Sequence, residues 1–213
     1  MGGIFFRCAR RAPVEAINDV GGDVVNLFRV IKKHPAALLD ELTGLGFSRA
    51  EFERQRLLDS ATLTDIERAA RFFYLQRAGF GGMVGSASFP AAAIRSRAMP
   101  ARAIETQLAA HSARLECVTI ERQAYADFIA AHDRPTTLFY LDPPYWGCEN
   151  YYGKGLFDRA DFARIASLMT AIKGAFILSL NDVPEVRRMF EAFHLRRLAV
   201  TTRRAARPGR TNC

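Results

Sequence analysis

The second half of the chain alternates between short apolar runs and amphipathic stretches. Residues 136–141 form a continuous apolar and β-branched run that stops at a pair of prolines, which is typical of a buried strand ended at its C-terminal edge. Asp158 is a suitable N-cap for a helix that Gly174 ends. The apolar positions of that helix, Phe162, Ile165, Met169 and Ile172, fall on one stripe.

The same alternation continues beyond this helix. Residues 175–180 predict a second buried strand, and Pro184 opens a predicted helix over residues 184–193 because proline is favoured at the first helical position. Residues 195–202 are a further strand candidate. Asn181, directly after the second strand, has two open roles, as a pocket residue or as a cap of the next helix.

The first half has a similar beginning and a different middle. Residues 14–19 predict a strand that ends in an acid, and residues 23–33 predict the helix behind it. Thr64 and Glu67 fit a capping box for a helix that ends at Gly79. Residues 80–90 are too glycine-rich for a core element, so we expect a loop or hairpin displayed on a helical insertion.

The order strand, helix, strand predicts an α/β fold with a parallel sheet and ligands at the carboxyl ends of its strands. The length of 213 residues suits one domain with a small insertion. No run approaches the roughly 18 apolar residues of a membrane span, and the start lacks a signal peptide's pattern, so we expect a soluble cytoplasmic monomer without membrane contact. The cysteines and histidines show no metal-ligand spacing, so we expect no metal.

The net charge of +8 favours a polyanionic partner such as nucleic acid. Four arginines in residues 203–213 account for half of it. Residues 78–104 contain no acid and carry Arg95, Arg97 and Arg102, which indicates a basic loop or ribbon. On charge alone, an arginine excess from coding bias explains these residues equally well.

Asp142-Pro143-Pro144-Tyr145-Trp146 carries the most chemical information. The two prolines fix φ and remove two backbone donors, so the Asp carboxylate and the prolyl carbonyls remain as acceptors beside an aromatic face. The exocyclic amino group of a nucleobase offers two N–H donors on a ring that an aromatic side chain can cover, and such stacking contributes roughly 1–3 kcal/mol per base. A strand-ending turn with a buried aromatic is the structural alternative.

Residues 139–145, Phe-Tyr-Leu-Asp-Pro-Pro-Tyr, resemble the signature of the amino-group DNA methyltransferases, in particular the N6-adenine enzymes of the GATC-methylase type, including prophage-encoded members. Residues 16–30 resemble that family's acidic cofactor strand and helix. Residues 72–82 resemble its helix and glycine turn before the DNA-reading hairpin. The three motifs have the family's order and spacing.

The resemblance implies transfer of a methyl group from S-adenosylmethionine to the N6 amino group of adenine in duplex DNA, without a metal. Asp142 and the carbonyl of Pro143 would accept the amino protons, Pro144 would complete the rigid motif, and Tyr145 would stack on the extruded base. Asp19 would bind the ribose hydroxyls of the cofactor. Gly2 and Gly3 would belong to the loop around its methionine moiety. The fold implied is a Rossmann-like S-adenosylmethionine-dependent methyltransferase sheet.

The resemblance also divides the chain. Residues 1–48 and 112–202 would form a discontinuous catalytic core, residues 49–111 a target-recognition insertion, and residues 203–213 a basic, disordered tail. In the insertion, DNA contacts are expected from six residues: Arg77, Gly81, Gly82, Arg95, Arg97 and Arg102. The target sequence is not fixed by these residues.

Both ends of the chain depart from the family pattern. Relatives begin with a strand that feeds the loop containing Gly2, and they continue beyond Thr202 into closing strands. The sequence therefore suggests a member truncated at both ends and with its N-terminal strand missing. Two alternatives to DNA adenine methylation follow, a catalytically impaired DNA-binding remnant and methylation of adenine in RNA.

Overall fold

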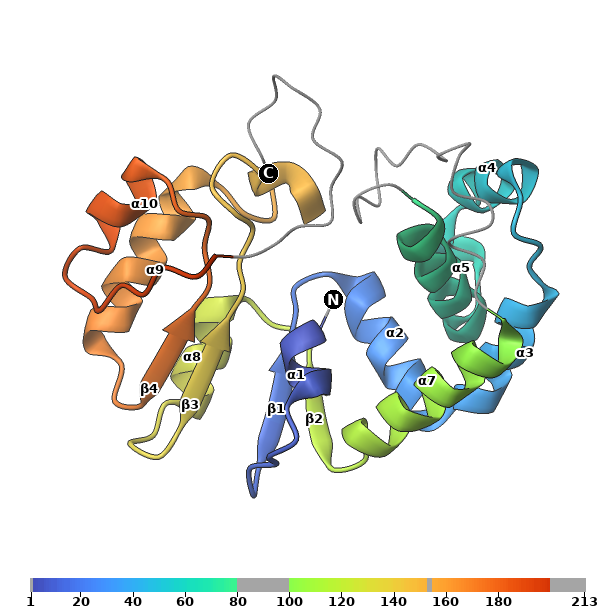
Figure 1. The fold of residues 1–213 in the computed structure, drawn as a ribbon, viewed down its shortest axis with the longest axis horizontal. Helices are drawn as coiled ribbons and strands as arrows, with labels where there is room; N and C mark the ends of the chain where they lie inside the picture. The colour runs from blue at the N-terminus through green and yellow to red at the C-terminus, as the bar shows by residue number, and fades with distance from the viewer. Residues whose placement is uncertain (1, 80–99, 153–154, 200–213) are drawn as a thin grey trace. The chain divides into compact units, whose positions relative to one another are not determined.

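The computed structural model describes residues 2–79, 100–152 and 155–199. The chain forms two compact units, Met1–Phe128 and Ile129–Cys213, here called the first and second units (Figure 1). Each unit contains one pair of parallel strands together with helices. The mixed α/β class with parallel pairing predicted from the sequence is confirmed at this level.

The first unit is mainly helical. Its helices are α1 (Gly3–Arg7), α2 (Gly22–Lys33), α3 (Pro35–Gly44), α4 (Arg49–Leu57), α5 (Asp65–Ala78) and α7 (Ala101–Leu115), with the short 3₁₀ turn η1 (Ser60–Thr62). Its strands are β1 (Glu15–Asn18) and β2 (Val118–Glu121), and α8 (Tyr125–His132) crosses into the second unit.

The core of the first unit lies where α2 and α3 pack against α5 and α7 (Figure 1). Helix α2 supplies Phe28 and Ile31, which are almost completely buried. Helix α5 begins with the predicted capping box, in which Thr64 accepts from the Glu67 N–H while the Glu67 carboxylate accepts from the Thr64 N–H. Burial of each large apolar side chain contributes about 1.5–3 kcal/mol to folding. The helices are therefore held firmly together, and they form a fixed support for the strands beside them.

Strands β1 and β2 run parallel, with Ile17 opposite Ile120. The long connection between them contains helices α2 to α7. Helix α7 is tied to β1 by Arg114, which is 9% exposed and donates to both carboxylate oxygens of Glu15 at 2.5 and 2.8 Å. The Arg114 guanidinium also lies 3.8 Å from the centre of the Phe5 ring in α1.

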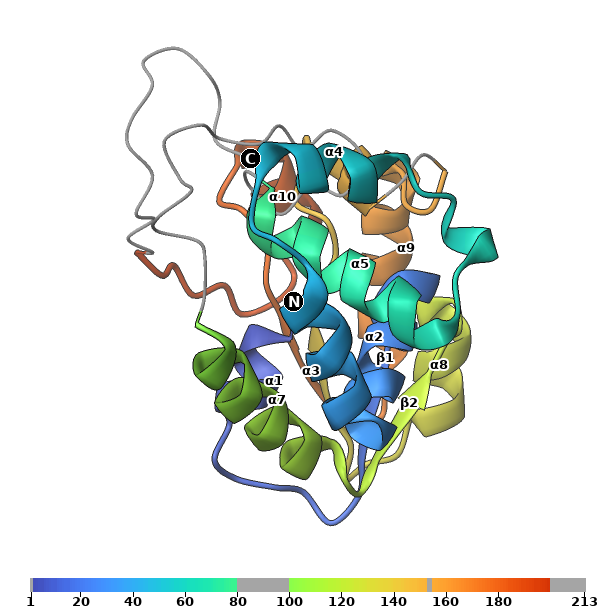
Figure 2. The same ribbon diagram turned by 90° about the vertical axis from the view of Figure 1, so that its right-hand side faces the viewer.

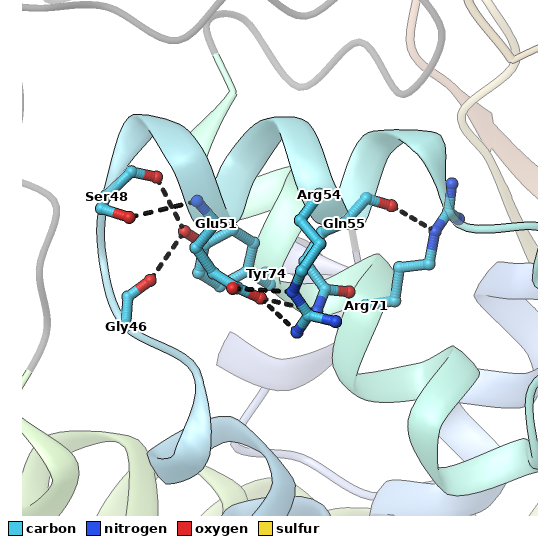
Figure 3. A network of polar contacts seen from close by, with 7 residues as sticks. All are labelled: Gly46, Ser48, Glu51, Arg54, Gln55, Arg71 and Tyr74. Atoms are coloured by element: carbon cyan, nitrogen blue, oxygen red, sulfur yellow. Dashed lines mark hydrogen bonds and ion pairs between the residues drawn. The ribbon is translucent and has the colours of Figure 1, made fainter.

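A second, smaller cluster joins α4 to the end of α5, which are neighbours in Figure 2. Phe52 packs there against Tyr74, whose hydroxyl donates to the Gly46 carbonyl at 3.0 Å (Figure 3). The Glu51 carboxylate accepts from Arg54 and Gln55, and Arg71 donates to the Gln55 carbonyl at 2.7 Å. These contacts fix the last turns of α5 before Gly79.

The second unit contains β3 (Leu138–Leu141) and β4 (Ala175–Leu178), with η3 (Glu149–Tyr152) and α9 (Arg159–Ala171) between them and α10 (Pro184–Met189) after them. The strands pair parallel with Tyr140 opposite Ile177. Phe162, Ile165 and Met169 of α9 are buried, as their stripe predicted. The side chains of Asp158 and Asp161 form a capping box at the start of this helix.

Gly174 has a role other than the helix ending expected from the sequence. Helix α9 ends earlier, at Ala171. A Cβ at Gly174 would lie 2.4 Å from the Thr137 carbonyl oxygen, a distance at which the backbone itself would have to move. The Asp133 carboxylate accepts from the Lys173 and Gly174 N–H groups at 3.0 Å, so the turn before β4 is held closely against the start of β3.

The predicted elements compare with the observed ones as follows. The strands expected at residues 14–19, 136–141 and 175–180 are confirmed with shorter bounds. The helix expected at residues 23–33 is confirmed and begins one residue earlier, at Gly22, and the helices after Asp158 and Thr64 are confirmed too. The helix expected over 184–193 ends at Met189. The strand candidate at 195–202 is wrong for residues 195–199, which have no regular structure, and residues 200–202 lie outside the described ranges.

Candidate functional site

The chain after β3 leaves the strand at Asp142, and the two prolines that follow prevent further pairing. Within the described residues, neither Pro143 nor Pro144 has a hydrogen-bond donor on its carbonyl oxygen. The Asp142 side chain is exposed to solvent. This segment therefore presents several oxygen acceptors at the carboxyl edge of a parallel strand pair, where ligands bind in open α/β sheets.

One oxygen of Asp142 is already occupied. Ser179, the first residue after β4, donates its hydroxyl to Asp142 Oδ1 at 2.6 Å. The Tyr140 hydroxyl lies 3.0 Å from the same serine oxygen. Among the described residues no group donates to Asp142 Oδ2, so this oxygen is available to a ligand.

The turn after the prolines is fixed by Asn181. Its side-chain amide accepts from the Trp146 N–H at 2.8 Å and donates to the Trp146 carbonyl at 3.0 Å. The Trp146 ring packs against Phe162 of α9, with 5.1 Å between ring centres. Of the two roles left open by the sequence, the cap of the next helix is wrong, because the N-cap of α10 is Val183 and no side chain caps it; the pocket role stays a prediction. The observed partner of the Asn181 side chain is the backbone of this turn.

Tyr145 is an exposed aromatic residue next to the two prolines. Its side chain is 40% exposed, and no hydrogen bond to its hydroxyl occurs within the described ranges. Partial burial, together with the nearby negative charge of Asp142, raises the pKa of the Tyr145 hydroxyl above its usual value. The residue therefore offers a neutral aromatic ring beside the acceptors of Asp142 and Pro143.

A second set of predicted residues lies at the carboxyl end of β1. Asp19 Oδ1 accepts from the Gly21 N–H at 2.7 Å, directly before α2. A Cβ at Gly21 would approach this oxygen to 3.0 Å, so glycine permits the tight turn. Burial raises the pKa of the Asp19 carboxyl, and the Gly21 hydrogen bond offsets part of that rise. Oδ2 has no donor among the described residues.

The neighbouring strand places further polar groups beside Asp19. Asn18 exchanges two hydrogen bonds with the backbone of Gln123, at 2.9 and 3.1 Å. The Gln123 side chain donates to Glu121 at 2.7 Å, and Arg122 donates to the Val20 carbonyl at 3.3 Å. These contacts hold together the two segments that follow β1 and β2 at the carboxyl edge of the pair.

Gly2 and Gly3, expected near a cofactor, begin helix α1. Gly2 has φ of 61°, and a Cβ there would lie 2.9 Å from the Phe6 ring. Gly3 has open space where a Cβ would be. Phe6 packs on Phe28 of α2 at 5.7 Å between ring centres, so Gly2 has a structural reason to be glycine.

Two of the predicted DNA-contacting residues are described, at the two ends of the segment 80–99. Arg77 is half-buried in the last turn of α5, and its Nε has no hydrogen-bond partner in the described structure. Burial lowers the pKa of its guanidinium. Arg102 is exposed in the first turn of α7, which carries no acid. Gly81, Gly82, Arg95 and Arg97 lie outside the described residues.

The comparison with known protein families is specific. The family model of the D12 class N6 adenine-specific DNA methyltransferases matches residues 2–204. The chain belongs to this family.

One relative similar to this chain is the Type II methyltransferase M1.LlaDCHI from Lactococcus lactis subsp. cremoris. The two are 30% identical over 91 aligned residues, which cover 38% of this chain and 30% of the relative. The chain thus matches less than a third of the relative's length. The family is an enzyme family, and the resemblance to N6-adenine DNA methyltransferases read from the sequence motifs is confirmed. The prophage origin and the truncation stay predictions.

The predicted base-site residues, Asp142 to Tyr145, form one continuous segment of the second unit, between β3 and the turn at Trp146 and Gly147. Asp19, Gly2, Gly3, Arg77 and Arg102 belong to the first unit. The sequence analysis did not find Ser179 or the polar groups of Asn18 and Gln123. Their only signal is position, because each lies at the end of a strand on the carboxyl edge of a parallel pair.

The described residues contain no group of three or more His, Cys, Asp or Glu side chains arranged to hold a metal ion. None of the helices in the described ranges has the length and apolar character needed to cross a membrane.

Proposed function

We propose that this D12 methyltransferase transfers a methyl group from S-adenosylmethionine to the N6 amino group of adenine in duplex DNA. The observation that carries the proposal is the hydrogen bonding of the Asp142 carboxylate. One of its oxygens is held by Ser179, whereas the other, like the Pro143 carbonyl, lacks a donor among the described residues. Two free acceptors beside an exposed tyrosine ring match an amino group on a planar base.

The adenine amino group has two N–H bonds, which Asp142 Oδ2 and the Pro143 carbonyl would accept. Accepting both protons would leave the nitrogen lone pair directed toward an incoming methyl group. Tyr145 would cover the base, which has to leave the stack of the duplex to reach such a site. Pro144 keeps the turn rigid, so these groups act by positioning and hydrogen bonding.

S-adenosylmethionine would supply an electrophilic methyl on its sulfonium. The residues present fit this cofactor, because Asp19 offers a partly buried carboxylate oxygen with no donor, and ribose hydroxyls are donors that would satisfy it. In the same proposal, the backbone of Gly2 and Gly3 would lie close to the methionine part of the cofactor. The β1–β2 and β3–β4 pairs, each parallel, support a Rossmann-like sheet with a catalytic core of residues 1–48 and 112–202.

Duplex DNA is the proposed partner, read by an insertion of residues 49–111. Arg77 supports this because a half-buried guanidinium without an acceptor costs free energy that a phosphate oxygen would offset. Arg102 adds a cation at the start of α7, where a helix disfavours one unless an anion is bound nearby. A role in restriction–modification belongs to the same proposal and is supported by the similarity to a Type II methyltransferase. Action as a monomer in the cytoplasm is also part of the proposal.

Radiolabelled S-adenosylmethionine distinguishes this function from its alternatives. The purified chain should label duplex DNA, and the label should be recovered as N6-methyladenine. Asp142→Ala should reduce labelling to background with an unchanged melting temperature, whereas Asp40→Ala, an exposed acid on α3, should keep full labelling. Labelling of RNA in place of DNA would favour the RNA alternative. DNA binding without cofactor binding would indicate a non-catalytic DNA-binding protein.

A further inference from the structure

We propose that Ser179 is a positioning residue that orients the Asp142 carboxylate, and that Tyr140 fixes the direction of the Ser179 hydroxyl. This inference rests on the proposed function, because it concerns how Asp142 would receive the amino group. It adds two residues outside the Asp-Pro-Pro-Tyr turn to the base site. The argument depends on contacts within the second unit alone.

The topology of the strand pair brings the three side chains together. Tyr140 and Asp142 are two residues apart along one extended segment, so they share a face. Ser179 stands two residues after Ile177, the partner of Tyr140 in the parallel register, and therefore lies on that face too. A serine one residue earlier or later would point to the opposite face of the pair.

The direction of each hydrogen bond among Tyr140, Ser179 and Asp142 follows from the number of protons available. A carboxylate only accepts, so Ser179 must donate its single proton across the 2.6 Å contact with Asp142 Oδ1. The serine oxygen can then only accept from the Tyr140 hydroxyl at 3.0 Å. The competing acceptor, the Leu141 carbonyl, is farther from the serine oxygen at 3.4 Å. The hydrogen bonds therefore run from Tyr140 to Ser179 to Asp142.

A purely structural role for Ser179 is less favoured by the same geometry. The Ser179 N–H already donates to the Leu141 carbonyl at 3.0 Å, which extends the parallel pairing beyond β4 without the side chain. The hydroxyl is therefore not needed to hold the two segments in register. What it does is occupy one Asp142 oxygen, so that rotation of the exposed carboxylate is restricted and Oδ2 keeps one direction.

The test compares Ser179→Ala, Ser179→Thr and Tyr140→Phe with the unmodified chain. In single-turnover methyl transfer, Ser179→Ala should lower the rate constant about 10- to 100-fold, the range expected for one hydrogen bond to a charged group. Ser179→Thr keeps the hydroxyl and should restore most of the rate. Tyr140→Phe should lower the rate by about threefold alone and have no effect on top of Ser179→Ala, because the two act in one chain.

A binding measurement separates positioning from stability. The unmodified chain should prefer a duplex with adenine at the target over one with purine, which lacks the 6-amino group. Ser179→Ala should lose this preference while its melting temperature and its affinity for S-adenosylmethionine stay the same. Ser167→Ala, which removes an exposed serine hydroxyl on α9, is the matched control and should behave as the unmodified chain.

The outcomes distinguish this inference from the proposed function. A Ser179→Ala rate within twofold of the unmodified chain, or a rate loss that follows the melting temperature and is not restored by threonine, would overturn the positioning role. If the unmodified chain methylates no nucleic acid, the proposed function fails. In that case, an adenine preference that still depends on Ser179 supports the inference, and one that does not overturns it.

Discussion

The side-chain amide of Asn181 binds both backbone polar groups of Trp146, accepting from its N–H at 2.8 Å and donating to its carbonyl at 3.0 Å. Both residues follow strands of the same parallel pair, Trp146 after β3 and Asn181 after β4. One side chain thus replaces the missing strand pairing between the two loops. The orientation of the turn that contains Pro143 and Tyr145 depends on it.

Asn181→Asp should therefore impair the second unit more than its small change in shape suggests. The new carboxylate oxygen would face the Trp146 carbonyl, so one hydrogen bond becomes a repulsion and the other remains. We expect a loss of about 1–3 kcal/mol in the free energy of unfolding by urea, together with a large loss of methyl transfer. Asn150→Asp, at an exposed position in η3, is the control and should change unfolding by less than about 0.5 kcal/mol. Equal stability of the two variants would contradict the role assigned to Asn181.

Tyr145 should act through its ring and not through its hydroxyl, which has no described partner. Tyr145→Phe should keep methyl transfer within about threefold, whereas Tyr145→Ala should weaken capture of the base by roughly 1–3 kcal/mol, the usual contribution of base stacking. Fluorescence of 2-aminopurine placed at the target position measures this capture. A phenylalanine variant as defective as alanine would show that the hydroxyl is needed.

The raised pKa of Tyr145 gives the same residue a pH signature. Burial is the larger cause and the Asp142 charge the second, and both disfavour the phenolate. Ultraviolet titration should therefore place Tyr145 above the ordinary tyrosine value, so the ring stays neutral throughout a pH 7–9 assay. Asp142→Asn should lower this titration point and leave it above the ordinary value, because the effect of burial remains. A titration point that does not respond to Asp142→Asn would show that the charge does not act on Tyr145.

Arg77 should bind DNA at a cost to the stability of the free protein. Arg77→Met keeps the apolar stem and removes a half-buried guanidinium whose Nε lacks a partner, so its unfolding free energy should stay the same or rise. Affinity for duplex DNA should fall, and the slope of log affinity against log salt should decrease by about one ion. Arg10→Met, at an exposed position of the first unit, should leave this slope unchanged. An unaltered slope in Arg77→Met would remove the residue from the DNA interface.

The pair formed by Glu15 and Arg114 should make the stability of the first unit depend on pH. The side-chain hydrogen bond from Arg114 is the largest influence on Glu15 and holds the pKa of its carboxyl below the usual value. An acid with a lowered pKa stabilises the folded state above its unfolded pKa, near 4.5, and this contribution is lost as the pH falls through the folded value. Glu15→Gln should abolish this part of the acid sensitivity.

The same pair allows a test by double substitution. Glu15→Gln leaves Arg114 buried at 9% exposure with its charge uncompensated, and we expect a loss of about 3–5 kcal/mol in unfolding free energy. Glu15→Gln with Arg114→Met removes that charge and should recover most of the loss. Additive losses in the double variant would mean that the two side chains do not act as a pair.

Elements whose signals are local could be predicted from the sequence. The capping box of Thr64 and Glu67 and the N-cap at Asp158 were both predicted and are confirmed. Asp161, three positions after Asp158, completes a second capping box that was not predicted. Strand β2 gave no comparable signal, because its two apolar residues, Val118 and Ile120, are separated by Thr119 and followed by Glu121. Helix α7 was also missed, although Ile104, Leu108 and Leu115 lie on one face at helical spacing and pack in the core of the first unit. Alanines and polar residues between them make this apolar pattern weak in the sequence.

The base site could be predicted only in part, because some of its contacts join residues that are far apart in the sequence. The Asp-Pro-Pro-Tyr turn is contiguous, so its chemistry can be read from residues 142–145 alone. Ser179 is 37 positions from Asp142, and their contact depends on the register in which β3 and β4 pair. For residues 195–199 the sequence predicted a strand that the structure does not contain. Leu195 and Leu198 suggested it, yet both are largely exposed and have no pairing strand among the described residues.

The close approach of Gly174 to the Thr137 carbonyl has a consequence for how this family member can change over time. It places a tight steric constraint at the amino ends of the β3–β4 pair, together with the Asp133 hydrogen bonds. The groups proposed for chemistry lie at the carboxyl ends, about 13 Å away for strands of four residues. Substitutions that alter the base turn can therefore accumulate without loosening the anchor of the strands, so new substrate preferences can arise at one end of the pair while the other preserves the fold.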